Sequence, residues 1–194
     1  MPFPAHCECV FAVIDTASKT GTEHDATAVT FFALERHGSA YPLMILDWDI
    51  VQIEGALLET WLPIVFRRLE ELAQQCRARG GSLGAMIEDK NSGTILLQQA
   101  LRRGMPATAI DSKLTAMGKD ERALNVSGYV FRGEVKYTDY AYNKVSPYKR
   151  RTKNHLVDQI ERFRMGDKDS KRDDDLLDTF CYGIAISLGN SEGF

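Results

Sequence analysis

Two short apolar runs, each ending in an acidic residue, most constrain what this chain can fold into. Residues 9–15 (Cys-Val-Phe-Ala-Val-Ile-Asp) and residues 83–88 (Leu-Gly-Ala-Met-Ile-Glu) are nearly continuous apolar stretches. Runs of this length are typical of strands that are buried on both faces in the middle of a sheet. The sequence therefore predicts a central sheet in which Asp15 and Glu88 stand at the ends of neighbouring strands.

Two further β-rich runs follow the first one. Residues 26–34 and 43–53 are rich in β-branched and aromatic residues, and the segments between the runs carry turn-forming Gly, Pro, Ser and Asp. Three strands joined by short connections predict an antiparallel meander at the start of the chain.

The apolar period then changes to that of a helix. Apolar residues between Trp61 and Ala73 recur every three or four positions, with charged residues between them, which indicates an amphipathic helix. We expect Thr60 to cap its start, Pro63 to lie in its first turn and Gly80-Gly81 to end it.

The second half of the chain alternates strands and helices. The run 83–88 precedes a helix starting at Asn91-Ser92-Gly93 and a brief strand over 106–110, which predicts a parallel βαβ unit. The pattern also predicts a small hairpin over 129–137 and helices over 119–126, 155–163 and 174–188. The expected fold class is α/β, with a mixed sheet of about five main strands, helices on both faces and a small β-hairpin.

The acids of the last predicted helix extend the pattern of the strand ends. Asp174, Asp175 and Asp178 fall on an arc of the helix beside its apolar arc. Acids at a helix N-terminus are favoured by the helix dipole alone, but this run has more of them than capping requires. Together with Asp15 and Glu88 they would form a cluster of anions that a divalent cation such as Mg²⁺ would stabilise.

Charge is distributed unevenly along the chain. The formal net charge is −3, yet residues 101–172 hold 17 Lys and Arg against 9 Asp and Glu. The densest basic run is 148–153, whose Lys149, Arg150, Arg151 and Lys153 are candidates for contacts with DNA phosphates. The alternative is that this run is an ordinary solvated loop.

Several classes of protein are excluded or disfavoured. No stretch approaches the roughly 18 consecutive apolar residues of a membrane-spanning helix, and no phosphate-binding Gly-x-x-x-x-Gly-Lys-Ser/Thr loop is present, so we expect no ATP hydrolysis. A length of 194 residues suits one soluble domain.

At four places the sequence resembles a known family, the nuclease domain of the phage large terminase subunit. The resemblance spans about residues 9–188 and is carried by the segments 11–17, 86–93, 119–122 with 133–135, and 174–178. It implies a ribonuclease H-like fold and metal-dependent cutting of concatemeric double-stranded viral DNA during genome packaging. By matching position, it implies two Mg²⁺ or Mn²⁺ ions held by Asp15, Glu88 and Asp175, with Asp174 sharing the role of its neighbour.

The same resemblance implies the setting in which the domain works. The ATPase domain that precedes this region in the family is absent here, so we expect residues 1–194 to form a single nuclease domain that is monomeric when isolated. The implied partners are double-stranded DNA, the terminase ATPase domain, the small terminase subunit and the portal. The resemblance further implies a bacteriophage protein that acts in the cytoplasm of the host cell.

Two other functions are consistent with the sequence. One is another ribonuclease H-like nuclease, such as a junction resolvase or a transposase core. The other is a DNA-binding or assembly module without catalytic activity.

Overall fold

The computed structural model describes residues 1–16, 26–39, 41–52, 58–90, 92–167 and 173–189. Six strands form one mixed sheet in the order β5-β4-β1-β2-β3-β6. The β1–β2 and β2–β3 pairs are antiparallel, whereas the β1–β4, β4–β5 and β3–β6 pairs are parallel. The strands are β1 (Cys9–Thr16), β2 (Ala26–Leu34), β3 (Leu43–Gln52), β4 (Ser82–Ile87), β5 (Ala107–Ala109) and β6 (Val135–Tyr137).

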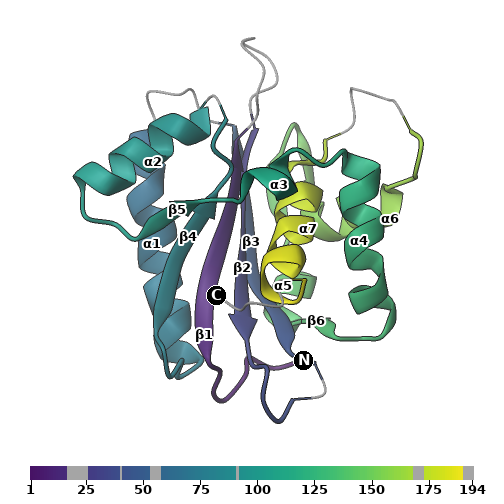
Figure 1. The fold of residues 1–194 in the computed structure, drawn as a ribbon, viewed down its shortest axis with the longest axis horizontal. Coiled ribbons are helices and arrows are strands. Elements are labelled where there is room, and N and C mark those ends of the chain that lie inside the picture. The colour runs from purple at the N-terminus through teal and green to yellow at the C-terminus, as the bar shows by residue number, and fades with distance from the viewer. Residues whose placement is uncertain (17–25, 40, 53–57, 91, 168–172, 190–194) are drawn as a thin grey trace.

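Helices cover both faces of this sheet (Figure 1). One face carries α1 (Leu58–Gln75) and α2 (Ser92–Arg102), and the other carries α4 (Lys119–Phe131), α6 (His155–Arg162) and α7 (Asp175–Ser187). Two short helices, α3 (Ser112–Thr115) and α5 (Asp139–Asn143), lie in connections. None of the described helices is long and apolar enough to cross a membrane.

The central strand β1 contributes to two cores. Phe11 and Val13 pack with α7 on one face, and Ala12 and Ile14 pack with α1 and α2 on the other. All eight residues of the strand are buried, which is why its sequence is a continuous apolar run rather than an alternating one. The meander of β1, β2 and β3 and the parallel unit β4-α2-β5 agree with the predicted topology.

The predicted hairpin over 129–137 is wrong. Helix α4 continues through Phe131, and the chain turns at Gly133, whose φ of 73° suits a residue without a side chain. The following strand, β6, pairs in parallel with β3 and becomes the sixth strand of the main sheet. A separate two-stranded hairpin lies further on, where β7 (Ser146–Tyr148) pairs with β8 (Arg151–Lys153).

Helix α1 differs from its prediction at both ends. It begins at Leu58, so Thr60 is not its cap and Pro63 lies beyond the first turn. A proline there leaves the carbonyl of Glu59 without its helical donor, and Nη1 of Arg103 donates to that oxygen instead (3.2 Å). The helix ends at Gln75, before Gly80-Gly81, and Arg77 turns the chain with a φ of 44°.

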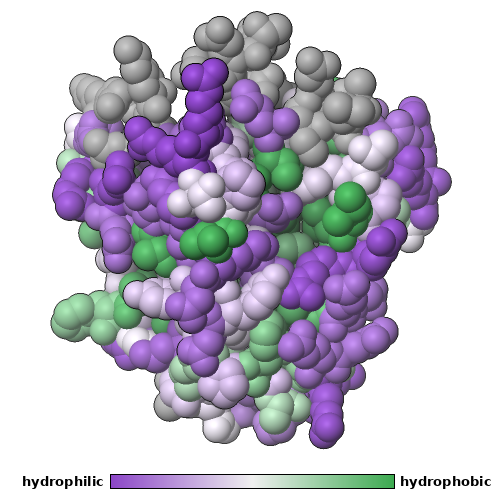
Figure 2. Space-filling view, turned by 180° about the vertical axis from the view of Figure 1, so that it is seen from behind, coloured by the Kyte–Doolittle hydropathy of each residue, from purple (hydrophilic) through white to green (hydrophobic). Residues whose placement is uncertain are grey.

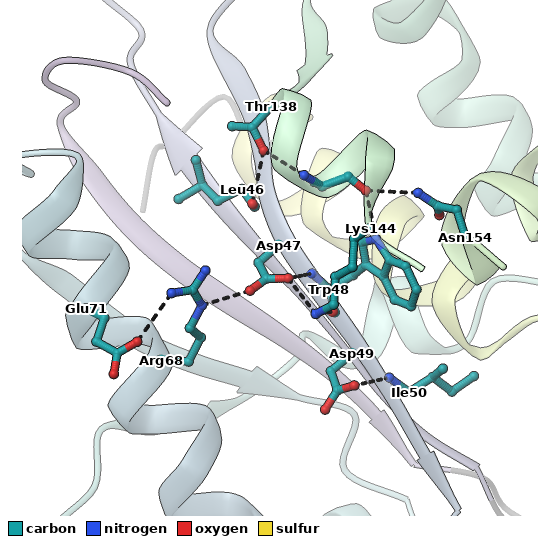
Figure 3. Close-up of polar contacts among 11 residues, drawn as sticks. Leu46, Asp47, Trp48, Asp49, Ile50, Arg68, Glu71, Thr138, Lys144 and Asn154 are labelled. Atoms are coloured by element: carbon teal, nitrogen blue, oxygen red, sulfur yellow. Dashed lines mark hydrogen bonds and ion pairs between the residues drawn. The ribbon is translucent and has the colours of Figure 1, made fainter. Parts of the chain in front are cut away.

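The edge of β3 is blunted by side chains. Strand β6 pairs only with residues 43–45 of β3, and beyond them the Asp47 and Asp49 carboxylates accept from the amides of Trp48 (2.7 Å) and Ile50 (3.0 Å) (Figure 3). Nζ of Lys144 donates to the carbonyl of Trp48.

Asp47 also holds this edge to the neighbouring helices. Its buried carboxylate accepts from Arg68 of α1 (2.8 Å) and from Lys144 after α5 (2.7 Å).

Seen from behind in Figure 2, the described surface is mostly hydrophilic, with apolar side chains in small separate patches.

Candidate active site

Asp15 and Glu88 meet at the carboxyl ends of two parallel strands. The amide of Glu88 donates to the carbonyl of Ile14 (3.2 Å), which continues the β1–β4 pairing past the end of β4. Because side chains alternate along a strand, Asp15 projects to the same face as Val13, and Glu88 to the same face as Met86. Both of these residues pack in the core beneath α7. The carboxyl groups of Asp15 and Glu88 are close enough for each to shift the pKa of the other.

Helix α7 directs its acidic first turn toward this pair. Its apolar residues, among them Leu176 and Leu177, are buried against the sheet. The acids do not cap the helix, since Asp174 at the N-cap position makes no side-chain capping bond within the described structure. The capping acceptor is Oε1 of Gln159, which receives the amides of Leu176 (2.9 Å) and Leu177 (3.0 Å). The acidic run is therefore not explained by helix capping.

The carboxyl groups perturb one another strongly. Burial, then the charge of Asp178 and the hydrogen bond to Glu88, raise the pKa of Asp15 well above its usual range. Burial, then the charges of Asp173 and Asp178, raise the pKa of Asp175 to about 7. Mutual repulsion of this kind means that the groups from β1, β4 and α7 lie near one another in a poorly solvated site.

The pKa of Glu88 shifts in the opposite direction from that of Asp15. Burial acts to raise its pKa, but hydrogen bonds from Asp15 and Lys90 outweigh burial and lower it. Its Oε1 atom accepts from Nζ of Lys90 (2.8 Å) and from the hydroxyl of Tyr182 (3.1 Å). Lys90 also donates to the carbonyl of Thr115 (2.9 Å), which fixes its position.

Basic residues also pair with the acids at the start of α7. Lys119 contacts Asp174, and Lys149 contacts Asp173. Asp178 receives a short hydrogen bond from the buried Arg122 (2.5 Å), whose guanidinium carbon lies 4.1 Å from the centre of the Tyr182 ring.

The donor chemistry of this site suits a hard divalent cation, because buried and mutually repelling carboxylates are the ligands that such ions prefer. Within the described residues, however, no set of three or more His, Cys, Asp or Glu side chains stands ready to hold a metal ion. Four of these carboxylates contact a lysine or an arginine, namely those of Asp173, Asp174, Asp178 and Glu88.

The predicted DNA-binding residues lie on the hairpin β7–β8. Its two-residue turn is Lys149-Arg150, and both residues have positive φ (46° and 60°), a strained choice for residues other than glycine. Arg150 and Arg151 are exposed, whereas Lys153 contacts Asp158 of α6. The hairpin therefore presents basic side chains near Asp173, at the edge of the acidic site.

The sequence analysis did not identify Tyr182. A signal was available, because at 100° per residue Tyr182 falls on the same arc of α7 as Asp175 and Asp178. It was overlooked because an aromatic residue in a buried helix is ordinarily a core residue.

The topology and the layering define a ribonuclease H-like α/β fold. A structure of the human cytomegalovirus terminase nuclease domain superposes with a TM-score of 0.59 at 15% identity, over 96% of this chain and 86% of that chain. A manganese-soaked structure of that domain gives a TM-score of 0.55 at 15% identity, over 95% and 86%. No family model matches the sequence, and neither does any curated protein. The chain has the fold of the terminase nuclease domains, which confirms the fold expected from the sequence.

Proposed function

We propose that this protein is a metal-dependent endonuclease that hydrolyses phosphodiester bonds of double-stranded DNA and cuts concatemeric viral DNA during genome packaging. The observation that carries the proposal is the meeting of the Asp15–Glu88 pair with the acidic first turn of α7. The terminase nuclease-domain fold supports it.

Asp15, Glu88 and Asp175 would hold two Mg²⁺ or Mn²⁺ ions, with Asp174 beside them. We assign the third position to Asp175 because Arg122 already neutralises Asp178, whereas the nearby carboxylates raise the pKa of Asp175. When bound, the ions would supply an activated water and neutralise charge at the leaving oxygen.

The protein side chains around these ligands would orient them and bind the DNA. Tyr182 and Lys90 hold one oxygen of Glu88, while exposed Arg150 and Arg151 are available to DNA phosphates without reading bases. Lys149 and Lys153 would add contacts along the same hairpin.

The wider setting follows from the same proposal. Residues 1–194 would act as one nuclease domain, monomeric when isolated, alongside a terminase ATPase domain, a small terminase subunit and a portal. The site of action would be the cytoplasm of the host cell.

The direct test is incubation of supercoiled plasmid with the protein and Mn²⁺, with and without a chelator. We expect nicked and linear products only with Mn²⁺, and none from Asp15→Asn. Full cutting by Asp15→Asn would refute the assignment. Preferential cutting of branched DNA would indicate a resolvase, and no calorimetric binding of millimolar Mn²⁺ would indicate a module without catalytic activity.

A further inference from the structure

Three lysines from three separate segments lie on carboxylates of the candidate site. Lys90 follows β4 and contacts Glu88, Lys119 begins α4 and contacts Asp174, and Lys149 at the hairpin turn contacts Asp173. Lys90 is held in place by the carbonyl of Thr115, and we propose that the other two, the rim lysines Lys119 and Lys149, exchange partners, moving from the carboxylates to DNA phosphates when duplex binds. The exchange would free Asp174 and withdraw the charge of Lys149 from the start of α7, so that DNA and divalent metal bind cooperatively.

This inference rests on the proposed function, but its starting point is the geometry of the lysine–carboxylate contacts. An ammonium group and a divalent ion compete for the same carboxylate oxygens, and Lys119 lies on Asp174 while Lys149 lies on Asp173, two residues before Asp175. Loss of these two lysine contacts would therefore favour the binding of a metal ion. Phosphate oxygens are equally good acceptors for an ammonium group, so a duplex at the rim would favour that loss.

The exposure of the basic side chains identifies which of them can exchange. The side chains of the rim lysines Lys119 and Lys149 are 39% and 30% exposed, whereas that of Arg122 is 9% exposed. Arg122 is also fixed by a bond to the carbonyl of Met117 (3.0 Å) and by its contact with the Tyr182 ring. The rim lysines can thus rotate toward a ligand, while Arg122 stays on Asp178.

By linkage, if duplex tightens metal binding, metal tightens duplex binding by the same factor. A lysine that only supplied a phosphate contact would leave this coupling unchanged on removal. A lysine that exchanges partners carries part of the coupling, so its removal lowers the coupling factor as well as the affinity for duplex.

The experiment measures the Mn²⁺ affinity by the EPR signal of the free ion, at fixed ionic strength, with and without a saturating short duplex. A gel at the end of each titration checks that the duplex is intact. For the wild-type protein we expect duplex to tighten Mn²⁺ binding by about tenfold. For Lys119→Met with Lys149→Met we expect tighter Mn²⁺ binding without duplex and a coupling factor of about two.

The matched control is Arg79→Met, which removes a positive charge at the opposite end of β1, where Arg79 pairs with Glu35 (3.1 Å). It should keep the wild-type coupling. If the double variant melts below the assay temperature, Lys149→Met alone should show a smaller fall in coupling.

An unchanged coupling factor in the lysine variants would overturn the exchange, and so would an equal fall in Arg79→Met. Either result, together with Mn²⁺-dependent cutting by the wild-type protein, would leave the proposed nuclease function intact. Failure of the wild-type protein to bind Mn²⁺ at all would instead overturn both proposals.

Discussion

Asp15 and Glu88 each stand one residue beyond the Ile14–Ile87 pair of two parallel strands, where the amide of Glu88 donates to the carbonyl of Ile14 (3.2 Å). Two buried acids this close disfavour each other's ionisation. Burial and the neighbouring acids raise the pKa of Asp15, whereas hydrogen bonds lower the pKa of Glu88 in spite of its burial.

Replacing Asp15 by Asn should abolish Mn²⁺-dependent cutting while stabilising the metal-free fold. A group whose pKa is raised on folding contributes stability at low pH, and that contribution is lost as the pH rises through the folded-state pKa. The amide cannot ionise, so in chelator the melting temperature of Asp15→Asn should exceed that of the wild-type protein, increasingly so at higher pH. The exposed neighbour Asp89→Asn is the control, and a lower melting temperature for Asp15→Asn would contradict the raised pKa of Asp15.

The raised pKa of Asp175 predicts that stability and Mn²⁺ affinity both change with pH near neutrality. Because its folded-state pKa is about 7, the metal-free protein should lose stability between pH 6 and pH 8, by about 5 °C in melting temperature. Mn²⁺ affinity should rise over the same interval, since the proton must leave before the carboxylate can bind an ion. Asp175→Asn should flatten the stability profile measured in chelator, and a wild-type slope in this variant would assign the titration to another group.

Tyr182→Phe tests the support of Glu88. The change removes the hydroxyl that donates to Glu88 (3.1 Å) but keeps the ring against Arg122. Since partners of metal ligands commonly contribute at least tenfold to affinity, Mn²⁺ binding should weaken by about tenfold with little change in melting temperature. Tyr142→Phe, at an exposed position, is the control. Wild-type Mn²⁺ affinity in Tyr182→Phe would show that the hydroxyl does not support the site.

Gly93→Ala should damage the turn that follows Glu88. A Cβ at Gly93 would lie 1.8 Å from the carbonyl oxygen of Glu88, so backbone must move. We expect a loss of about 1–3 kcal/mol in unfolding free energy and of about 100-fold in cutting. Gly118→Ala has open space around it among the described atoms and should retain both properties. Equal unfolding free energies and equal cutting rates for Gly93→Ala and Gly118→Ala would mean that the turn can accommodate a Cβ at Gly93.

Asp47→Ala should be among the most destabilising single changes on the edge of the sheet. It would leave Arg68 and Lys144 without their buried partner, at a cost of about 3–5 kcal/mol. Asp49→Ala loses one hydrogen bond, to the amide of Ile50, and should cost about 1 kcal/mol. Urea unfolding of both variants measures the difference, and similar midpoints would refute the role given to Asp47.

The sequence could predict elements whose signals are local. The apolar runs 9–15 and 83–88 identified the central strands. The acid at the end of each run placed Asp15 and Glu88 at the ends of neighbouring strands. The face that the two side chains share was not predicted, and it follows in the structure from the alternation of side chains along β1 and β4.

What could not be predicted depended on tertiary contacts. Strand β6 has only three residues and is defined by pairing with β3, so Gly133 was interpreted as the turn of a hairpin. The hairpin β7–β8 turns at Lys149-Arg150, without the glycine or asparagine that normally marks such a turn. The partners of Lys119 and Lys149 lie 55 and 24 positions away, and no local pattern encodes those pairs. The metal-ligand roles of Asp15, Glu88 and Asp175 stay predictions.

The blunted edge of β3 has a consequence for how this domain can associate with others. A strand from another molecule would have to displace the Lys144 ammonium from the carbonyl of Trp48 and the carboxylates from the amides of Trp48 and Ile50. These internal bonds protect the molecule against edge-to-edge pairing of its sheet with the strands of other molecules. A partner that approaches this edge would therefore have to bind it through side chains, because the backbone groups of Trp48 and Ile50 named here are already bonded within the molecule.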